Sequence, residues 1–217
     1  MLVKNILSTE SSMRSDIVFL GDSLTSGENN NNKSFVEYLN VGALNFGISG
    51  TCIGDYSLYP VGKSNLIDIL QQNAEPIQRA RCIFLEYGCN DVSSIVVKNT
   101  TLQKVKIELI KCLDYIHQLN PTVEIYFITL CKCNIKTFAQ AQTNYLKNDY
   151  LHFSNISYHK WIRTYKKFNK FINQICSNVV CLTDTELCED ELDTDKLHPN
   201  AVGYKRISCN LMLHINI

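Results

Sequence analysis

Four short segments carry residue types that could together catalyse a reaction at a carbonyl carbon. They are Gly21-Asp22-Ser23, Gly47-Ile48-Ser49-Gly50, Gly88-Cys89-Asn90-Asp91 and Asp195-Lys196-Leu197-His198. A serine hydroxyl is a weak nucleophile unless a base takes its proton and nearby donors stabilise the negative charge that develops. The segments offer a serine, a histidine beside an acid, and glycine and asparagine donors. Their chemistry therefore depends on whether the fold brings them together.

Each residue has a possible role in such a reaction. Histidine has an ordinary pKa of about 6.5, so His198 could take the proton of Ser23 near neutral pH. Asp195 could accept a hydrogen bond from the other ring nitrogen and fix the tautomer. The backbone N–H groups of Ser23 and Gly50 and the side-chain amide of Asn90 could bind the oxyanion.

Each segment also has a purely structural interpretation when it is taken alone. Gly-Asp-Ser is an ordinary turn composition, and the Asn90-Asp91 pair could cap the segment that follows it. His198 precedes a proline and could simply begin a helix. We interpret Asp22 as a residue that stabilises the turn rather than as a catalyst.

Hydrophobic patterning predicts strands that alternate with helices along the whole chain. The predicted strands are 16–20, 43–46, 82–85, 124–130 and 179–182, and the predicted helices are 34–40, 65–79, 101–119, 159–176 and 201–213. This alternation is typical of βαβ units, so it predicts a parallel five-stranded sheet with helices on both faces. Three of the four segments begin within three residues of the end of a predicted strand, and the fourth follows the last strand through a polar loop. All four should therefore lie at the carboxyl edge of the sheet, where ligands bind in such folds.

Some local predictions are more specific. Gly21 should end the first strand and allow a sharp turn, and Ser34 should cap the following helix. Val202, Ile207 and Leu211 should face the core from the last helix. Residues 51–64 are interpreted as a loop. Residues 131–157 lack a firm period, which indicates either a lid or specificity segment or an irregular crossover with a short helix.

Composition restricts the class of protein. The chain has 217 residues, of which 45% are hydrophobic, and no linker or repeat divides it, so we expect one domain over 1–217 with 1–15 as a loose arm. Its 21 basic and 21 acidic residues cancel, which disfavours nucleic acid or an anionic membrane as a partner. No apolar segment is long enough to span a bilayer, and the N-terminus does not resemble a signal peptide. If the sequence is complete, these features predict a cytoplasmic protein without integral membrane association.

The ten cysteines do not form a recognisable metal site. Cys131 and Cys133 are the closest pair, and no further cysteine or histidine lies at zinc-finger spacing from them. We therefore expect reduced, structural thiols, no metal and no organic cofactor.

The four segments together resemble the four sequence blocks of the GDSL, or SGNH, hydrolase family. The blocks are Gly21-Asp22-Ser23-Leu24, the glycine of Asn45-Phe46-Gly47-Ile48-Ser49-Gly50, Gly88-Cys89-Asn90-Asp91 and Asp195-Lys196-Leu197-His198-Pro199, in the family's order. The resemblance implies a flavodoxin-like three-layer α/β/α fold and hydrolysis of esters by a serine. It implies Ser23 as nucleophile, His198 as base, Asp195 as the residue that orients the base, and Ser23, Gly50 and Asn90 as the oxyanion hole. Gly47 is an alternative to Gly50.

The substrate is less well determined. The family includes carbohydrate O-acetyl esterases, lysophospholipases, thioesterases and aryl esterases. The mixed polar and aromatic residues of 51–64 and 131–157 favour a small acyl or carbohydrate O-acetyl ester over a longer acyl chain, which would need an apolar groove. A flavodoxin-like module that binds phosphate without catalysis is the alternative from another class, although no phosphate-binding glycine motif is present.

Overall fold

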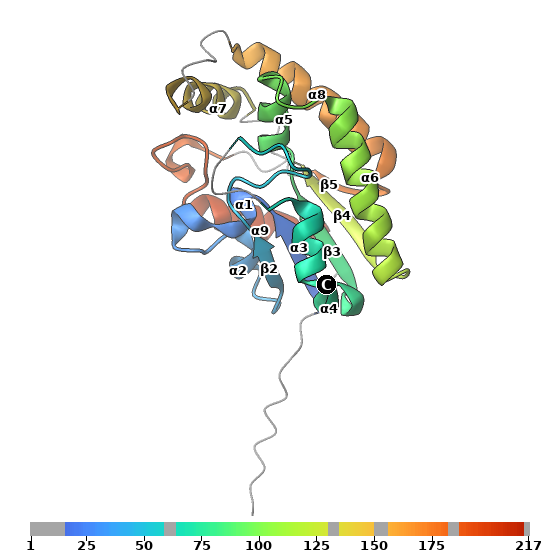
Figure 1. Cartoon of the computed structure of the whole chain (residues 1–217). Coiled ribbons are helices and arrows are strands. Elements are labelled where there is room, and N and C mark those ends of the chain that lie inside the picture. Colours follow the sequence, from blue (N-terminus) through green and yellow to red (C-terminus); the bar gives the residue numbers. More distant parts are fainter. Residues whose placement is uncertain (1–15, 59–63, 130–134, 150–155, 182–186, 215–217) are drawn as a thin grey trace, which may run out of the picture.

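The computed structural model of this chain (Figure 1) describes residues 16–58, 64–129, 135–149, 156–181 and 187–214. The sheet is built from β1 (Ile17–Gly21), β2 (Leu44–Gly47), β3 (Cys82–Glu86), β4 (Glu124–Thr129) and β5 (Asn178–Cys181). Its order is β2-β1-β3-β4-β5, and every pairing is parallel. This is the flavodoxin-like strand order, so the predicted α/β fold with a parallel five-stranded sheet is confirmed.

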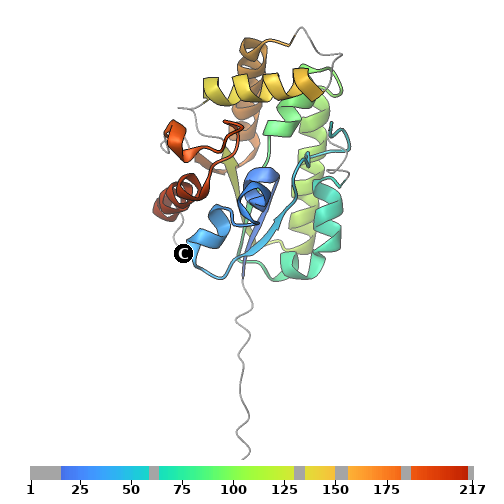
Figure 2. The same cartoon turned by 90° about the vertical axis from the view of Figure 1, so that its left-hand side faces the viewer.

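Helices cover both faces of the sheet. The described helices are α1 (Ser23–Ser26), α2 (Phe35–Leu39), α3 (Leu66–Gln72), α4 (Ala74–Arg79), α5 (Cys89–Val96), α6 (Leu102–Leu119), α7 (Ile135–Asp149), α8 (Tyr158–Ile175) and α9 (Ala201–His214). Seen from the side, α2 and α9 lie on one side of the sheet and α3 and α6 on the other (Figure 2).

The two faces form separate hydrophobic cores because successive strand residues point to opposite sides. Val18 and Leu20 of β1 pack in the core beneath α3, α6 and α8, whereas Ile17 and Phe19 pack in the core beneath α2 and α9. The Phe19 ring stacks on Phe84 of the neighbouring strand, with centroids 4.6 Å apart. The result is the three-layer α/β/α arrangement.

The prediction of one continuous helix over 65–79 is wrong. The structure has two helices, α3 and α4, with Asn73 between them. Pro76 explains the break, because a proline inside a helix lacks the N–H that would bond four residues back and its ring collides with that carbonyl. The side chain of Asn73 also donates to the carbonyl of Ile69, which satisfies the end of α3.

Three other elements, namely α9, α1 and α5, also differ from the prediction. Val202 does not face the core but is 59% exposed, and Tyr204 is buried beside Ile207 and Leu211 instead. The spacing of 204, 207 and 211 is helical, whereas 202 lies on the other side of α9. The helices α1 and α5 were not predicted at all. Ser34 caps α2 as expected, with a reciprocal bond from its own N–H to Glu37.

The segment 131–157 contains the fifteen-residue helix α7, so its described part is neither irregular nor a short helix. Several predictions fall outside the described residues, namely those for the arm 1–15 and for Leu130, Cys131, Cys133 and Leu182. No helix among the described residues is long and apolar enough to cross a membrane.

Candidate active site

The candidate site lies at the carboxyl end of β1, where the order in which the strands are added to the sheet reverses. From β1 the chain continues to β2 on one side, and β3 lies on the other side of β1. Loops that leave the carboxyl ends of such a strand pair diverge and leave a crevice between them, which is where ligands bind in open α/β sheets. Ser23 follows β1, and Asn90 follows β3. Both therefore sit at this crevice.

A tight turn between β1 and α1 positions Ser23. Gly21 does not have a positive φ; it is needed because a Cβ there would overlap the side chain of Thr25 and lie 2.7 Å from the carbonyl oxygen of Glu86. The predicted reason for this glycine, conformational freedom, is therefore replaced by close packing. Asp22 caps α1 by accepting a hydrogen bond from the N–H of Leu24 at 3.1 Å. Ser23 is then the first residue of the helix.

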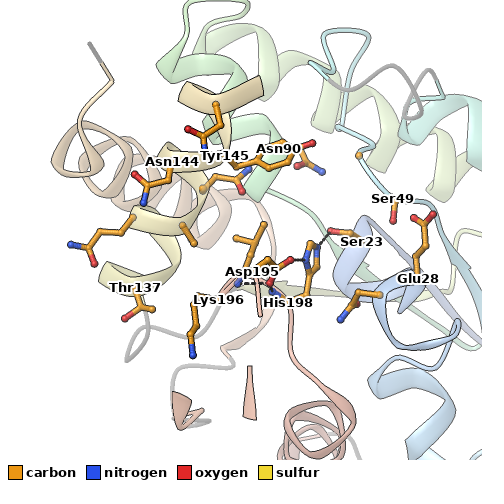
Figure 3. Close-up of a pocket in the computed structure, with 17 residues that line it drawn as sticks. Ser23, Glu28, Ser49, Asn90, Thr137, Asn144, Tyr145, Asp195, Lys196 and His198 are labelled. Carbon is orange, nitrogen blue, oxygen red and sulfur yellow. Dashed lines mark hydrogen bonds and ion pairs between the residues drawn. The ribbon is translucent and has the colours of Figure 1, made fainter. Parts of the chain in front are cut away.

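His198 and Asp195 form a hydrogen-bonded chain with Ser23 (Figure 3). The Nε2 atom of His198 is 2.8 Å from the Ser23 Oγ, and its Nδ1 is 2.6 Å from Asp195 Oδ2. The other carboxylate oxygen of Asp195 accepts from the N–H groups of Leu197 and His198. Partial burial works against ionisation of Asp195, but these hydrogen bonds outweigh it and lower its pKa to about 2.

Contacts from a distant part of the chain fix the loop that carries His198. The N–H of Asp193 donates to the carbonyl of His198 at 2.7 Å, which closes the loop on itself. The side chain of Asn29 donates to the carbonyl of Pro199 at 3.0 Å and accepts from the hydroxyl of Tyr204. The role of Asn29 depends on contacts about 170 residues away, which no local sequence pattern reveals.

The backbone N–H groups of Ser23 and Gly50 have no acceptor in the described part of the chain. Both residues line the same cavity. Gly50 has a φ of 76°, a conformation that glycine adopts readily. The N–H of Gly47, the alternative candidate, is already donated to the Asn45 side chain at 2.9 Å. The geometry thus favours Gly50 over Gly47 as an oxyanion donor.

The side-chain amide of Asn90 also reaches the cavity, but its nitrogen is engaged. It lies 2.9 Å from the carbonyl oxygen of Thr51 and 3.3 Å from Asp22 Oδ2. Asn90 could donate to an oxyanion by giving up the longer of these contacts, the one to Asp22.

A pair of buried carboxyl groups supports this arrangement and was not predicted from the sequence. Asp22 and Glu86 are almost completely buried and hydrogen-bonded to each other, and the hydroxyl of Thr25 donates to Glu86 at 3.1 Å. Burial raises the pKa of Asp22 to about 6, and burial followed by the charge of Asp22 raises the pKa of Glu86 well above its usual value. Two adjoining buried carboxyl groups do not both ionise, so the pair of Asp22 and Glu86 holds a proton.

All five residues predicted for the site line one cavity of about 780 Å³, namely Ser23, Gly50, Asn90, Asp195 and His198. The opposite wall comes from α7, whose lining residues include Thr137, Asn144 and Tyr145 (Figure 3). Tyr145 is one of the aromatic residues that the sequence offers for a specificity segment over 131–157, whereas Thr137 and Asn144 carry no comparable signal.

Comparison with known proteins agrees with this geometry. The sequence profile of the GDSL-like lipase/acylhydrolase family matches residues 19–206. A comparison with curated proteins gives no match.

Several solved structures are similar to this chain across nearly their whole length. The acetyl xylan esterase AlAXEase has a TM-score of 0.61 at 14% identity, with 92% of this chain and 98% of that chain covered. The lipase Lip_vut3 from a goat rumen metagenome has a TM-score of 0.59 at 18% identity, covering 91% and 96%. The family 3 carbohydrate esterase of Clostridium thermocellum has a TM-score of 0.53 at 17% identity, covering 91% and 93%. At these identities the likeness shows a shared fold.

The family profile begins in β1 and ends in α9, so it includes every segment that forms the crevice. The chain therefore belongs to the GDSL-like lipase/acylhydrolase family and is an ester-hydrolysing enzyme.

Proposed function

We propose that this enzyme cleaves carboxylic esters through a covalent acyl-enzyme on Ser23. The observation that carries the proposal is the hydrogen-bonded chain from Ser23 Oγ through His198 to Asp195. This chain opens on a cavity beside the N–H groups of Ser23 and Gly50, which have no acceptor among the described residues. We also propose that 1–217 forms one hydrolase domain.

In the first half-reaction His198 takes the proton of Ser23 as its oxygen attacks the ester carbonyl. Asp195 holds the ring in the tautomer that leaves Nε2 free to accept, and its negative charge stabilises the imidazolium. The N–H groups of Ser23 and Gly50, and Asn90 once it releases Asp22, donate to the oxyanion. His198 then gives the proton to the departing alcohol.

In the second half-reaction water attacks the acyl-enzyme. His198 takes a proton from the water and returns one to Ser23, which releases the carboxylic acid and restores the free serine. These steps use side chains and backbone groups of this chain alone.

For the substrate, we propose a small acyl group, with a carbohydrate O-acetyl ester preferred over a longer acyl chain. Most of the side chains that line the cavity carry hydroxyl or amide groups. The apolar surface of the cavity includes Ala141, Leu197 and the ring of Tyr145. Two structures that share the fold are named as an acetyl xylan esterase and a carbohydrate esterase, whereas a third is named as a lipase. A series of p-nitrophenyl esters from acetate to palmitate decides between short and long acyl groups.

The mechanism is tested by Ser23→Ala with p-nitrophenyl acetate as substrate. We expect kcat to fall by about 10³-fold or more, because no other group takes over the role of the nucleophile. Ser177→Ala is the matched control, since Ser177 is an exposed serine that does not line the cavity. Activity of Ser23→Ala close to that of the control would exclude this mechanism.

A further inference from the structure

One side of α7 presents a row of polar side chains to the cavity. Thr137, Gln140, Asn144 and Asn148, here called the α7 polar stripe, are spaced by three, four and four residues and all line the cavity. This spacing places them on one side of the helix. Thr137 and Asn144 lie across the cavity from Ser23 and His198 (Figure 3).

The opposite side of α7 anchors the helix to the rest of the protein. The Phe138 ring packs against Trp161 of α8 with centroids 5.5 Å apart, and Ala139 and Leu146 are fully buried. Gln142, which borders the cavity, adds a further anchor because its amide donates to the hydroxyl of Ser93 in α5 at 3.0 Å. These contacts fix the orientation of α7, so the α7 polar stripe faces the cavity as part of a formed wall.

The four side chains of the stripe make no hydrogen bond to any described residue. An amide can donate and accept at the same time, as can a sugar hydroxyl, so the two groups match each other. None of the four is charged, which makes the stripe a poor site for a phosphate or another anion. A neutral ligand with several hydroxyl groups uses these donors and acceptors best.

The remaining surface of the cavity suits the carbon skeleton of a sugar. Its walls expose more carbon than polar atoms, including the Tyr145 ring, which is 43% exposed, and Leu197. A sugar ring has apolar C–H faces as well as hydroxyl edges and can use both kinds of surface. A long acyl chain along the stripe would instead strip water from the amides without replacing their hydrogen bonds.

We propose that the α7 polar stripe binds the alcohol portion of the ester, and that this portion is a neutral polyhydroxylated ring such as a sugar. The inference rests on the proposed function, because it assumes that the ester is cleaved at Ser23. It adds which wall recognises the alcohol and by which chemistry.

The test compares two acetates that differ in hydroxyl groups. The mono-O-acetyl esters of methyl glucoside carry a polyhydroxylated ring, and cyclohexylmethyl acetate carries a ring of the same size without hydroxyls. The variant is Gln140→Ala combined with Asn144→Ala, which preserves the helix because alanine favours it. Lys136→Ala is the matched control, since Lys136 is an exposed residue of α7 that does not line the cavity.

We expect the double variant to lower kcat/KM for the best glucoside acetate by about tenfold or more, from two lost hydrogen bonds. Its kcat/KM for cyclohexylmethyl acetate should stay within about twofold, and the control should change neither value. An equal loss for both acetates, or no loss for either, overturns the proposal. A change in the preferred acyl length of p-nitrophenyl esters without a sugar-specific loss also overturns it, because the stripe would then contact the acyl group.

The wild-type enzyme provides a further criterion. If it cleaves cyclohexylmethyl acetate at least as efficiently as every glucoside acetate, the stripe does not recognise hydroxyls and the inference is wrong. Failure of the proposed function has a different signature, since Ser23→Ala would then retain activity on all of these esters.

Discussion

At the scale of single residues, the ionisation of Asp195 determines how His198 behaves. Three hydrogen bonds converge on its carboxylate, and they keep it charged although it is partly buried. A charged acceptor at Nδ1 leaves Nε2 without a proton and directed at Ser23. To hold His198 in this tautomer, residue 195 must be negatively charged, and a neutral hydrogen-bonding side chain is not sufficient.

We predict that Asp195→Asn lowers kcat by about 10³- to 10⁴-fold, because the amide can donate to Nδ1 and stabilise the wrong tautomer. Glu189→Gln is the control, since it removes an exposed acid from the same loop. Steady-state kinetics with p-nitrophenyl acetate measures both. Equal kcat values for the two variants would argue against this role for Asp195.

At the scale of elements, the turn between β1 and α1 is the most constrained part of the site. The end of β1, the first turn of α1 and the end of β3 meet at Gly21, where there is no room for a side chain. Ser23 lies two residues further on. A change in the path of this turn must displace the hydroxyl from His198.

We predict that Gly21→Ala lowers the free energy of unfolding by about 3 kcal/mol or more and removes most esterase activity, because the added methyl group forces Thr25 or Glu86 to move. Gly42→Ala is the matched comparison. Gly42 has a positive φ of 67°, and no atom of the described residues lies within 4 Å of a Cβ there, so only backbone strain of about 1–2 kcal/mol is expected. Urea denaturation of the two variants measures the difference, and similar losses would contradict the packing argument.

The boundaries of helices and strands could be predicted only where nearby residues carry a signal, such as hydrophobic periodicity or a proline. The strands and the amphipathic helices α6 and α8 follow from hydrophobic periodicity, and their buried residues include Val105, Leu109, Trp161 and Phe168. The break at Asn73 was predictable in principle, because Pro76 is a local signal that the helical pattern of 65–79 obscured. The face of α7 that lines the cavity could not be predicted from the sequence, because it depends on how α7 packs on α5 and α8.

At the scale of the whole molecule, segments far apart in sequence meet at the crevice. Asp91 at the start of α5 accepts hydrogen bonds from the N–H of Ile53 and the hydroxyl of Tyr56, at 3.0 and 2.8 Å, and so ties α5 to the connection between β2 and α3. Its other oxygen is buried without a partner in the described part of the chain. Burial raises the pKa of Asp91 to about 7.

This raised pKa predicts a loss of stability as pH rises. In the unfolded chain Asp91 releases its proton near pH 3.9, whereas the folded protein keeps it until about pH 7. The stabilising contribution is therefore complete below about pH 4 and is lost as pH rises through 7. Between about pH 4 and 8 the free energy of unfolding of the wild type should fall by a few kcal/mol relative to Asp91→Asn, which cannot ionise. Urea denaturation at several pH values measures this difference, and a constant difference would refute the buried proton.

The convergence of the four sequence segments was predictable because parallel strands place their carboxyl ends on one edge. The exact partners were not predictable, because contacts such as Asn29 with Pro199 and Asp22 with Glu86 join residues that no short pattern connects. These contacts determine whether Ser23 and His198 stand 2.8 Å apart, and they arise only in the folded chain.

The most direct test of the central claim is the identification of the residue that carries the acyl group during turnover. The enzyme is mixed with p-nitrophenyl acetate and quenched in acid within its first turnovers, and its peptides are analysed by mass spectrometry. We predict an acetyl group on the peptide that contains Ser23, at the hydroxyl of Ser23, and no acetylated peptide from Ser23→Ala. Acetylation at another residue with full activity in Ser23→Ala would contradict the account.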